Sequence, residues 1–466
     1  MGTFGINLNT SGFGLGTGIN VQTTVATIIQ ADEAPEQPML NEQTFLQSQS
    51  SAISNISSLL TTLQTSVQAL QDPQGQLTSQ VANSSNTAVL TATTTGGATL
   101  ENHTITVGTL ASTSSVYTTS LTNGNTTFSG GQIQLQVGSN SPVTIPVDST
   151  THNDNTLNSL ASYINKNSQT LGVTANVITD AGGARLSIVS NTTGQPGNIT
   201  VVSNTTGLNF NNATTGLPNA IAGVNASLSV DGVPVSSASN TVTGAIPGVT
   251  LNLVGTSSTA VTLGIAPDTT QATSAVNNFV SAYNAVVQAI NTQFSYTAGA
   301  SSQPPLFADS GLQQVQQTLN TDINTALTGN NGITNLESIG VSLQDDGTLQ
   351  VNSATLSSAL TNNFSAVQNL FQQTTGQKGF AVQLNSDLTN LTNTISGPLA
   401  IDLQGVNSSL TAVANEINDF QANITTQQQQ LTTQFSQVNA TLQQLPLIIE
   451  QIDSELGLST GGTTGA

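Results

Sequence analysis

The sequence predicts an α+β multidomain fold, with an antiparallel helical, coiled-coil leg built from both chain ends and β-rich head domains inserted between them. Three observations lead to this prediction. Apolar residues recur every seven positions near each end of the chain. The middle alternates apolar and polar residues in short runs. Finally, 466 residues are too many for a single core of ordinary size.

We expect residues 1–38 to be a flexible N-terminal segment that contains a short terminal helix. Residues 39–75 are predicted to form the N-terminal leg helix, which ends at QDPQG because proline and glycine interrupt helical hydrogen bonding. The apolar positions that recur every seven residues in this helix, which we call its seam, are Met39, Leu46, Ile53, Leu60 and Val67.

The region from residue 76 to residue 268 is rich in Val, Ile and Thr that alternate with polar residues, which favours half-buried strands. One helix is expected at TLNSLASYINKNS, where Leu157, Leu160 and Ile164 fall on one face. We assign residues 76–127 and 223–268 to one β-rich head domain. Residues 128–222 form a second β-rich domain inserted in the first, and the Asn- and Thr-rich stretch before residue 223 is its return loop.

Residues 269–445 return to a helical period and are predicted to form a helical domain with a β-hairpin near 340–351. Asp345-Asp346-Gly347 supplies the turn of this hairpin, because Asp-Gly adopts positive backbone angles readily. The second leg helix lies at the end of this domain. Its seam consists of Leu410, Ile417, Ile424, Leu431, Val438 and Leu445.

Pro446 predicts a break in the last helix, because an interior proline costs about 3 kcal/mol or more unless the helix kinks or restarts. We expect residues 39–70 to pair with residues 415–445, so that Pro35 and Pro38 lie level with Pro446. The C-terminal segment, 446–466, and the N-terminal end would then form a separate, mobile terminal assembly segment. Its apolar residues are Ile19, Val21, Val25, Ile28, Ile29, Leu447, Ile448, Ile449, Ile452 and Leu456.

Composition argues against several classes of function. The chain has three Lys and Arg residues against 23 Asp and Glu residues, so it cannot neutralise a nucleic-acid backbone, and nucleic acid is not an expected partner. It has no cysteine, so disulfides and thiolate metal sites are excluded. No run of about 20 apolar residues occurs, so membrane insertion is not expected. The N-terminus lacks the features of a cleaved secretory signal peptide.

No sequence motif of an enzyme is present, and we expect no catalytic residue, cofactor site or metal site. Asp345 and Asp346 are interpreted as turn residues rather than ligands. His103 in a strand-like run and His152 in a polar loop are interpreted as ordinary surface or packing residues, because no serine or carboxylate constellation accompanies them.

Several stretches, in order along the chain, resemble the flagellar filament cap family, FliD (flagellar hook-associated protein 2). They are TGINVQTTVATIIQADEAPEQPMLNEQ, SVDGVPVSSASNTVTGAIPGVTLNLVG, PLFADSGLQQVQQTL, LESIGVSLQDDGTLQVNSATLSSAL and LTTQFSQVNATLQQL. The stretch TLNSLASYINKNSQTLGVTANVITDAGGARLSIVS is similar to a small repeat found in several flagellar hook and filament proteins. The sequence departs from the family in its low charge, which shifts the contacts of the leg toward apolar and Gln/Asn side chains.

The resemblance implies a non-enzymatic structural cap at the distal end of the bacterial flagellar filament, where exported flagellin folds and inserts. It implies a homo-oligomeric ring, most often a pentamer in the family. The expected partners are flagellin, hook–filament junction proteins before filament growth, and an export chaperone at the C-terminus. The protein would be extracellular, at the flagellum tip, and exported without a cleaved signal peptide. The alternatives are another flagellar axial protein, such as a hook–filament junction protein or a flagellin, or a secreted surface adhesin.

Overall fold

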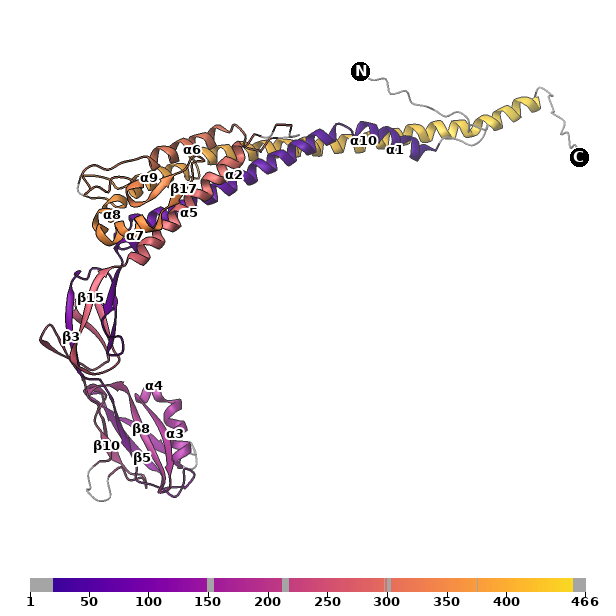
Figure 1. Cartoon of the computed structure of the whole chain (residues 1–466). Coiled ribbons are helices and arrows are strands. Elements are labelled where there is room, and N and C mark those ends of the chain that lie inside the picture. Colours follow the sequence, from indigo (N-terminus) through magenta and orange to yellow (C-terminus); the bar gives the residue numbers. More distant parts are fainter. Residues whose placement is uncertain are drawn as a thin grey trace, which may run out of the picture. The chain divides into compact units, whose positions relative to one another are not determined.

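The computed structural model describes residues 20–148, 155–211, 218–296, 298–299, 303–374 and 376–455. The chain divides into two compact units (Figure 1). A helical unit contains Met1–Gln71, Val276–Leu356 and Asn369–Ala466, and a β-rich unit contains Asp72–Ala275 and Ser357–Gln368. This arrangement agrees with the α+β multidomain fold that the sequence predicts.

Long helices dominate the helical unit, and a short hairpin of two antiparallel strands accompanies them. The helices that belong to it in whole or in part are α1 (Val21–Asp32), α2 (Glu36–Gln71), α5 (Thr269–Phe294), α6 (Ser310–Ile323), α7 (Ser353–Asn362), α8 (Phe364–Phe371), α9 (Phe380–Leu391) and α10 (Pro398–Glu455). The hairpin strands are β16 (Val341–Leu343) and β17 (Leu349–Val351), at the position expected from the sequence.

The core of the helical unit forms where α2 packs against α9 and α10. Leu60, Leu63 and Val67 of α2 are fully buried. An aromatic cluster fills the neighbouring space, because the Phe380 ring meets the Phe279 ring edge-on at 5.5 Å and the Phe371 ring at 6.1 Å between centroids. This apolar cluster fixes the helices at the base of the long α2 and α10 pair.

Asn284 of α5 attaches the hairpin to the helices. Its side-chain amide donates to the Leu349 carbonyl at 2.8 Å and its side-chain oxygen accepts from the Leu349 N–H at 2.7 Å. In the turn, Asp346 accepts from the Thr348 N–H and hydroxyl, and these bonds lower the pKa of the Asp346 carboxyl. Gly347 has a φ of +82°, as the turn chemistry requires. Asp346 therefore acts as a turn residue.

Two β modules make up most of the β-rich unit. The outer module has a five-stranded sheet in the order β1-β15-β3-β11-β12 and a three-stranded sheet in the order β13-β14-β2. Its strands are β1 (Gln80–Ser84), β2 (Leu90–Thr94), β3 (Asn102–Thr109), β11 (Ala226–Val230), β12 (Val233–Ser237), β13 (Thr241–Ile246), β14 (Val249–Leu253) and β15 (Ser257–Pro267).

The inserted module lies between β3 and β11 in the sequence and combines sheets in the orders β10-β4-β8-β7 and β6-β5-β9. Its elements are β4 (Thr113–Tyr117), β5 (Gly131–Val137), β6 (Val143–Val147), α3 (Leu157–Lys166), α4 (Ser168–Leu171), β7 (Val173–Asp180), β8 (Gly183–Thr193), β9 (Ile199–Asn204) and β10 (Ala220–Ile221). The expected boundary at residue 128 falls inside this module, because β4 pairs with β8. The module therefore begins near Thr113.

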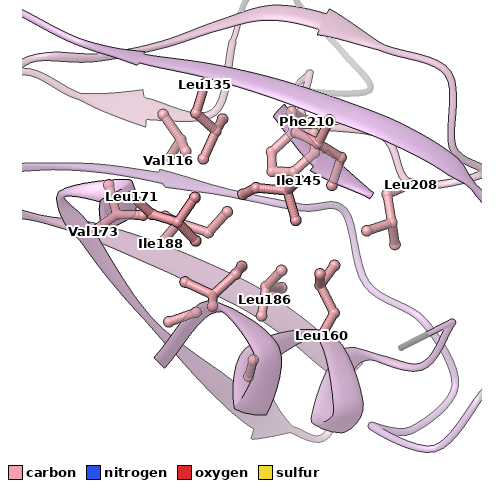
Figure 2. Close-up of a cluster of buried hydrophobic side chains, with 14 of the residues drawn as sticks. Val116, Leu135, Ile145, Leu160, Leu171, Val173, Leu186, Ile188, Leu208 and Phe210 are labelled. Carbon is pink, nitrogen blue, oxygen red and sulfur yellow. The ribbon is translucent and has the colours of Figure 1, made fainter. Parts of the chain in front are cut away.

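The core of the inserted module contains apolar side chains from both sheets and from α3 (Figure 2). Leu160 of α3 faces Leu186 and Ile188 of β8 across it, and all three are fully buried. The helix begins at a capping box, in which the Thr156 hydroxyl accepts from the Ser159 N–H and the Ser159 hydroxyl accepts from the Thr156 N–H. The helix predicted at TLNSLASYINKNS is confirmed.

Candidate assembly surface

The two leg helices, α2 and α10, run side by side and antiparallel (Figure 1). Near one end the Ser50 hydroxyl lies 3.5 Å from the Asn407 side-chain oxygen. Further along, the Gln421 amide donates to the Glu36 carboxylate of α2 at 2.6 Å, and the Gln427 amide donates to Asp32, the last residue of α1, at 2.8 Å. These polar pairs, formed by amides and carboxylates rather than by ion pairs, define the register of the leg.

The register differs from the one that the sequence led us to expect. Glu36 lies level with Gln421, so the prolines at the start of the N-terminal helix lie near the middle of α10 and not level with Pro446. The two registers differ by about 27 residues, close to four seven-residue repeats. The expected pairing of 39–70 with 415–445 is therefore wrong.

The seam of α2 is covered along its length, whereas the seam of α10 is covered only in its first part. On α2, Met39 is half-buried and Leu46, Ile53, Leu60 and Val67 are buried. On α10, Ile417 is buried, Leu410, Ile424 and Leu431 are half-buried, and Val438 and Leu445 are exposed. The pattern identified both helices correctly, but it could not tell which seam residues face a partner within the chain.

The short helix α1 packs against α10 rather than standing apart from the leg. Val25 and Ile29 are buried, and Val21 and Ile28 are half-buried. The Asn20 side chain caps the helix by accepting from the Thr23 N–H. The expectation of a separate segment is therefore wrong for α1, which forms part of the leg. Ile19 lies outside the described residues.

No break occurs at Pro446, because α10 continues from Pro398 to Glu455. A proline cannot donate to the carbonyl four residues earlier, which belongs here to Leu442. The helix surface around it is open, with Leu442 half-buried and Leu445 and Leu447 exposed, so water can reach that carbonyl. The predicted interruption is wrong for this reason.

The last turns of α10 carry an apolar surface that nothing in the described part of the chain covers. Val438, Leu442, Leu445, Ile449 and Ile452 follow a spacing of four and three residues, which places them on one face of the helix. We call these five residues the terminal strip. Leu447 and Ile448 add exposed apolar side chains beside it, at 64% and 48% exposure. Leu456 lies outside the described residues.

Most of the terminal strip lies in an uncharged stretch of the chain, and Glu450 and Asp453 stand beside its last two residues in the sequence. No Asp, Glu, Lys or Arg occurs from Phe420 to Ile449. A partner of this surface therefore has to offer apolar side chains, because no ion pair is available between Phe420 and Ile449.

The remaining candidate groups are the two histidines and the possible metal ligands. His103 is buried with its Nδ1 2.8 Å from the Asp231 carboxylate, and the Asp231 oxygens also accept from the Thr104 N–H. The hydrogen bond from His103 is the largest cause of the lowered pKa of Asp231. Within the described ranges, no group of three or more His, Asp and Glu side chains could hold a metal ion. His152 lies outside those ranges.

Sequence reasoning missed one set of polar residues, the carboxyl groups of Asp322, Asp387, Asp309 and Asp402. They come together only through the packing of α6 against α9 and α10, and their spacing along the chain carries no sign of it. Among the described helices, none is long and apolar enough to span a bilayer.

Comparison with known protein families gives a consistent result. The family model described as the flagellar hook-associated protein 2 N-terminus matches residues 17–114, and the model described as its C-terminus matches residues 223–446. Together they match more than half of the chain. The chain belongs to the flagellar hook-associated protein 2 family.

Two relatives in the hook-associated protein 2 family match over most of their length. The B-type flagellar hook-associated protein 2 of Pseudomonas aeruginosa is 28% identical over 405 residues, which cover 81% of this chain and 84% of the relative. The flagellar hook-associated protein 2 of Escherichia coli K12 is 28% identical over 437 residues, covering 90% and 92%. The crystal structure of the D1-D2-D3 domains of the E. coli flagellar cap protein FliD matches with a TM-score of 0.59 at 27% identity, covering 76% of this chain and 99% of that one.

A further match concerns the inserted module of this hook-associated protein 2 family member. The flagellin hook IN motif model matches residues 120–192. This stretch includes α3, β7 and β8, whose sequence resembled a repeat of flagellar hook and filament proteins. That resemblance is confirmed.

Proposed function

We propose that this protein is the structural cap at the distal end of the bacterial flagellar filament, where it promotes folding and insertion of exported flagellin. Membership of the hook-associated protein 2 family and the likeness to the E. coli flagellar cap protein support this function. The structural observation that carries the proposal is the terminal strip, an exposed apolar surface near the end of a long helix.

The strip is the surface through which this chain contacts other chains of the filament tip. Four of its side chains are 40–47% exposed and Leu442 is more buried, so each gains at most roughly 1 kcal/mol if a partner covers it. Five such residues give at most about 5 kcal/mol, which only matches the lower end of the entropic cost of association. The strip therefore works together with contacts from further copies in a homo-oligomeric ring, for which the family favours a pentamer.

The apolar side chains outside the strip favour more than one neighbour. Ile448 widens the strip, because it lies three residues after Leu445, but Leu447 points to the opposite side of α10. A single partner helix covers only one side. A helix that is apolar on several sides fits inside a bundle. Flagellin, the hook–filament junction proteins and an export chaperone are the further partners that we propose for this segment.

Deletion of the gene tests the cap function directly. We expect the deletion strain to release flagellin monomers into the medium without building filaments, as seen by electron microscopy and immunoblotting. Filaments of normal length in the deletion strain would overturn the proposal.

Complementation tests the role of the strip. We expect the double variant Leu445→Asn, Ile449→Asn to leave the fold intact, because both side chains are exposed, and to restore no filaments. The matched control is Ile395→Asn, which changes an exposed isoleucine of the helical unit outside the strip and should restore normal filaments. Retention of the double variant inside the cell would show that the strip binds the export chaperone and not the filament tip. Full restoration of filaments would show that the strip is needed neither for export nor for assembly.

A further inference from the structure

Helix α6 is flanked at both ends by pairs of carboxyl groups that face each other. Asp322 in its last turn meets Asp387 of α9, and Asp309 at its N-terminus meets Asp402 of α10. Two carboxylates placed side by side repel each other, whereas a carboxylic acid and a carboxylate can share a proton through a hydrogen bond. The protonation of these carboxyl pairs therefore affects how stably α6 packs against α9 and α10.

The pair at the C-terminal end is buried. Asp322 is only 5% exposed, and its Oδ2 has no hydrogen-bond partner among the described residues. Asp387 accepts from the Gln383 side-chain amide at 2.7 Å, which holds the Asp387 carboxylate in place. Tyr283 of α5 lies close enough to Asp322 for an electrostatic interaction between them, and the Tyr283 side chain is fully buried. Asp387 and Tyr283 are thus the titratable groups that face Asp322 from the helices packed around it.

Burial, the charge of Asp387 and the hydrogen bond between the two carboxyl groups raise the pKa of Asp322 to about 7. Burial also raises the pKa of Tyr283 to about 12, with a smaller effect from Asp322, so Tyr283 keeps its proton throughout the neutral range. Asp322 is therefore the group of this cluster that changes charge near neutral pH.

The pair at the N-terminal end has its own geometry. Asp309 caps α6 by accepting from the Leu312 N–H at 2.8 Å. A Cβ atom at Gly311 would overlap the Asp402 carboxylate and would lie 3.4 Å from Asp309 Oδ1, which shows that both carboxyl groups crowd the same point. Within the described structure, Asp402 Oδ2 has no hydrogen-bond partner. Burial, and then the charge of Asp309, raise the pKa of Asp402.

We propose that α6 is held on α9 and α10 by proton-sharing carboxyl pairs, so that this helix is firmly docked in acid and loosens as the pH rises through neutrality. The direction follows from linkage. Because the pKa of Asp322 in the folded protein lies above its ordinary value of 3.8, the folded state keeps a proton that the opened state has lost. Docking is strongest below about pH 4 and is weakened progressively as the pH rises to about 7. The proposal does not depend on the proposed cap function.

Hydrogen–deuterium exchange of the full-length protein tests this proposal. We expect the protection of the amides of α6, corrected for the intrinsic rate of exchange, to fall about tenfold between pH 6 and pH 8, as a pKa near 7 requires. The amides around Ile53 of α2 serve as the internal reference and should keep their protection. Equal pH dependence in α6 and in α2 would overturn the proposal.

Two variants assign the effect to the carboxyl pairs. Asp322→Asn and Asp402→Asn each replace one acid by an amide that donates to its partner at every pH. We expect the Asp322→Asn variant to lose most of the pH dependence of α6 and the Asp402→Asn variant to lose it in the first turn. Asp419→Asn, which removes an exposed carboxylate from α10, is the matched control and should behave as the wild type. Wild-type pH dependence in both test variants would contradict the proposal even if α6 itself responds to pH.

Discussion

The register of the leg can be tested by disulfide cross-linking, because the natural chain contains no cysteine. The perturbation is the double variant Ser50→Cys, Asn407→Cys, which places thiols where two side chains approach to 3.5 Å across α2 and α10. The comparison variant is Met39→Cys, Leu445→Cys, which joins the residues that the seven-residue pattern alone had paired.

The two variants differ by a distance that can be worked out from the helices. With Glu36 level with Gln421, Met39 lies level with about residue 418. Leu445 is then roughly 27 residues further along α10, or about 40 Å away at 1.5 Å per residue. A disulfide requires Cα atoms within about 7 Å of each other. The second variant therefore cannot close a disulfide within one chain, whereas the first places its thiols at an observed contact between the two helices.

Mild oxidation of dilute protein, followed by non-reducing electrophoresis and thiol counting, provides the assay. We expect the Ser50→Cys, Asn407→Cys variant to form a monomeric cross-linked species with no free thiols. The Met39→Cys, Leu445→Cys variant should keep its thiols or form only concentration-dependent oligomers. A monomeric cross-link between positions 39 and 445, formed as readily as the first, would refute the register.

Three further outcomes are expected. Leu60→Ala should lower the free energy of unfolding by about 2–5 kcal/mol in denaturant titrations, because Leu60 is fully buried, whereas the half-exposed Val438→Ala should change it by less than about 1 kcal/mol. Gly311→Ala should lower the midpoint of thermal unfolding, because its Cβ would overlap the Asp402 carboxylate. Adding Asp402→Ala should restore stability, and a double variant as unstable as the single one would contradict the overlap. Asn284→Ala should release the hairpin from α5, so that the Leu349 amide exchanges faster while the Leu63 amide is unchanged. Equal exchange at Leu349 in the variant and the wild type would contradict the role of Asn284.

Much of the fold could be predicted because many of its elements depend on residues that are close together in the sequence. The seams of α2 and α10, the hairpin around Gly347 and the helix that contains Leu160 all follow from residue spacing, and each is present. The limits of the inserted module depend instead on the pairing of β4 with β8, whose residues are far apart in the sequence. Local sequence patterns do not indicate which distant strand β4 pairs with.

The register was not predictable from the seams for a physical reason. A seam that repeats every seven residues pairs almost equally well after a shift of whole repeats, and the error was about four of them. The choice between registers comes from less regular features, such as Glu36 with Gln421 and Asp32 with Gln427. The carboxyl pair of Asp322 and Asp387 was missed for a similar reason, because helix packing alone brings the two residues together.

The insertion of one module inside another imposes an order on folding. β1 pairs with β15, and β3 with β11, across a loop that contains the stretch from Thr113 to Ile221, so the two ends of that stretch lie close together. A folded inserted module shortens that loop and so lowers the entropic cost of closing the outer sheets. The outer module in turn brings α2 toward the later helices in the same way. This nesting favours folding from the inside outward, and the leg can be completed only when α10, the last helix in the sequence, is present.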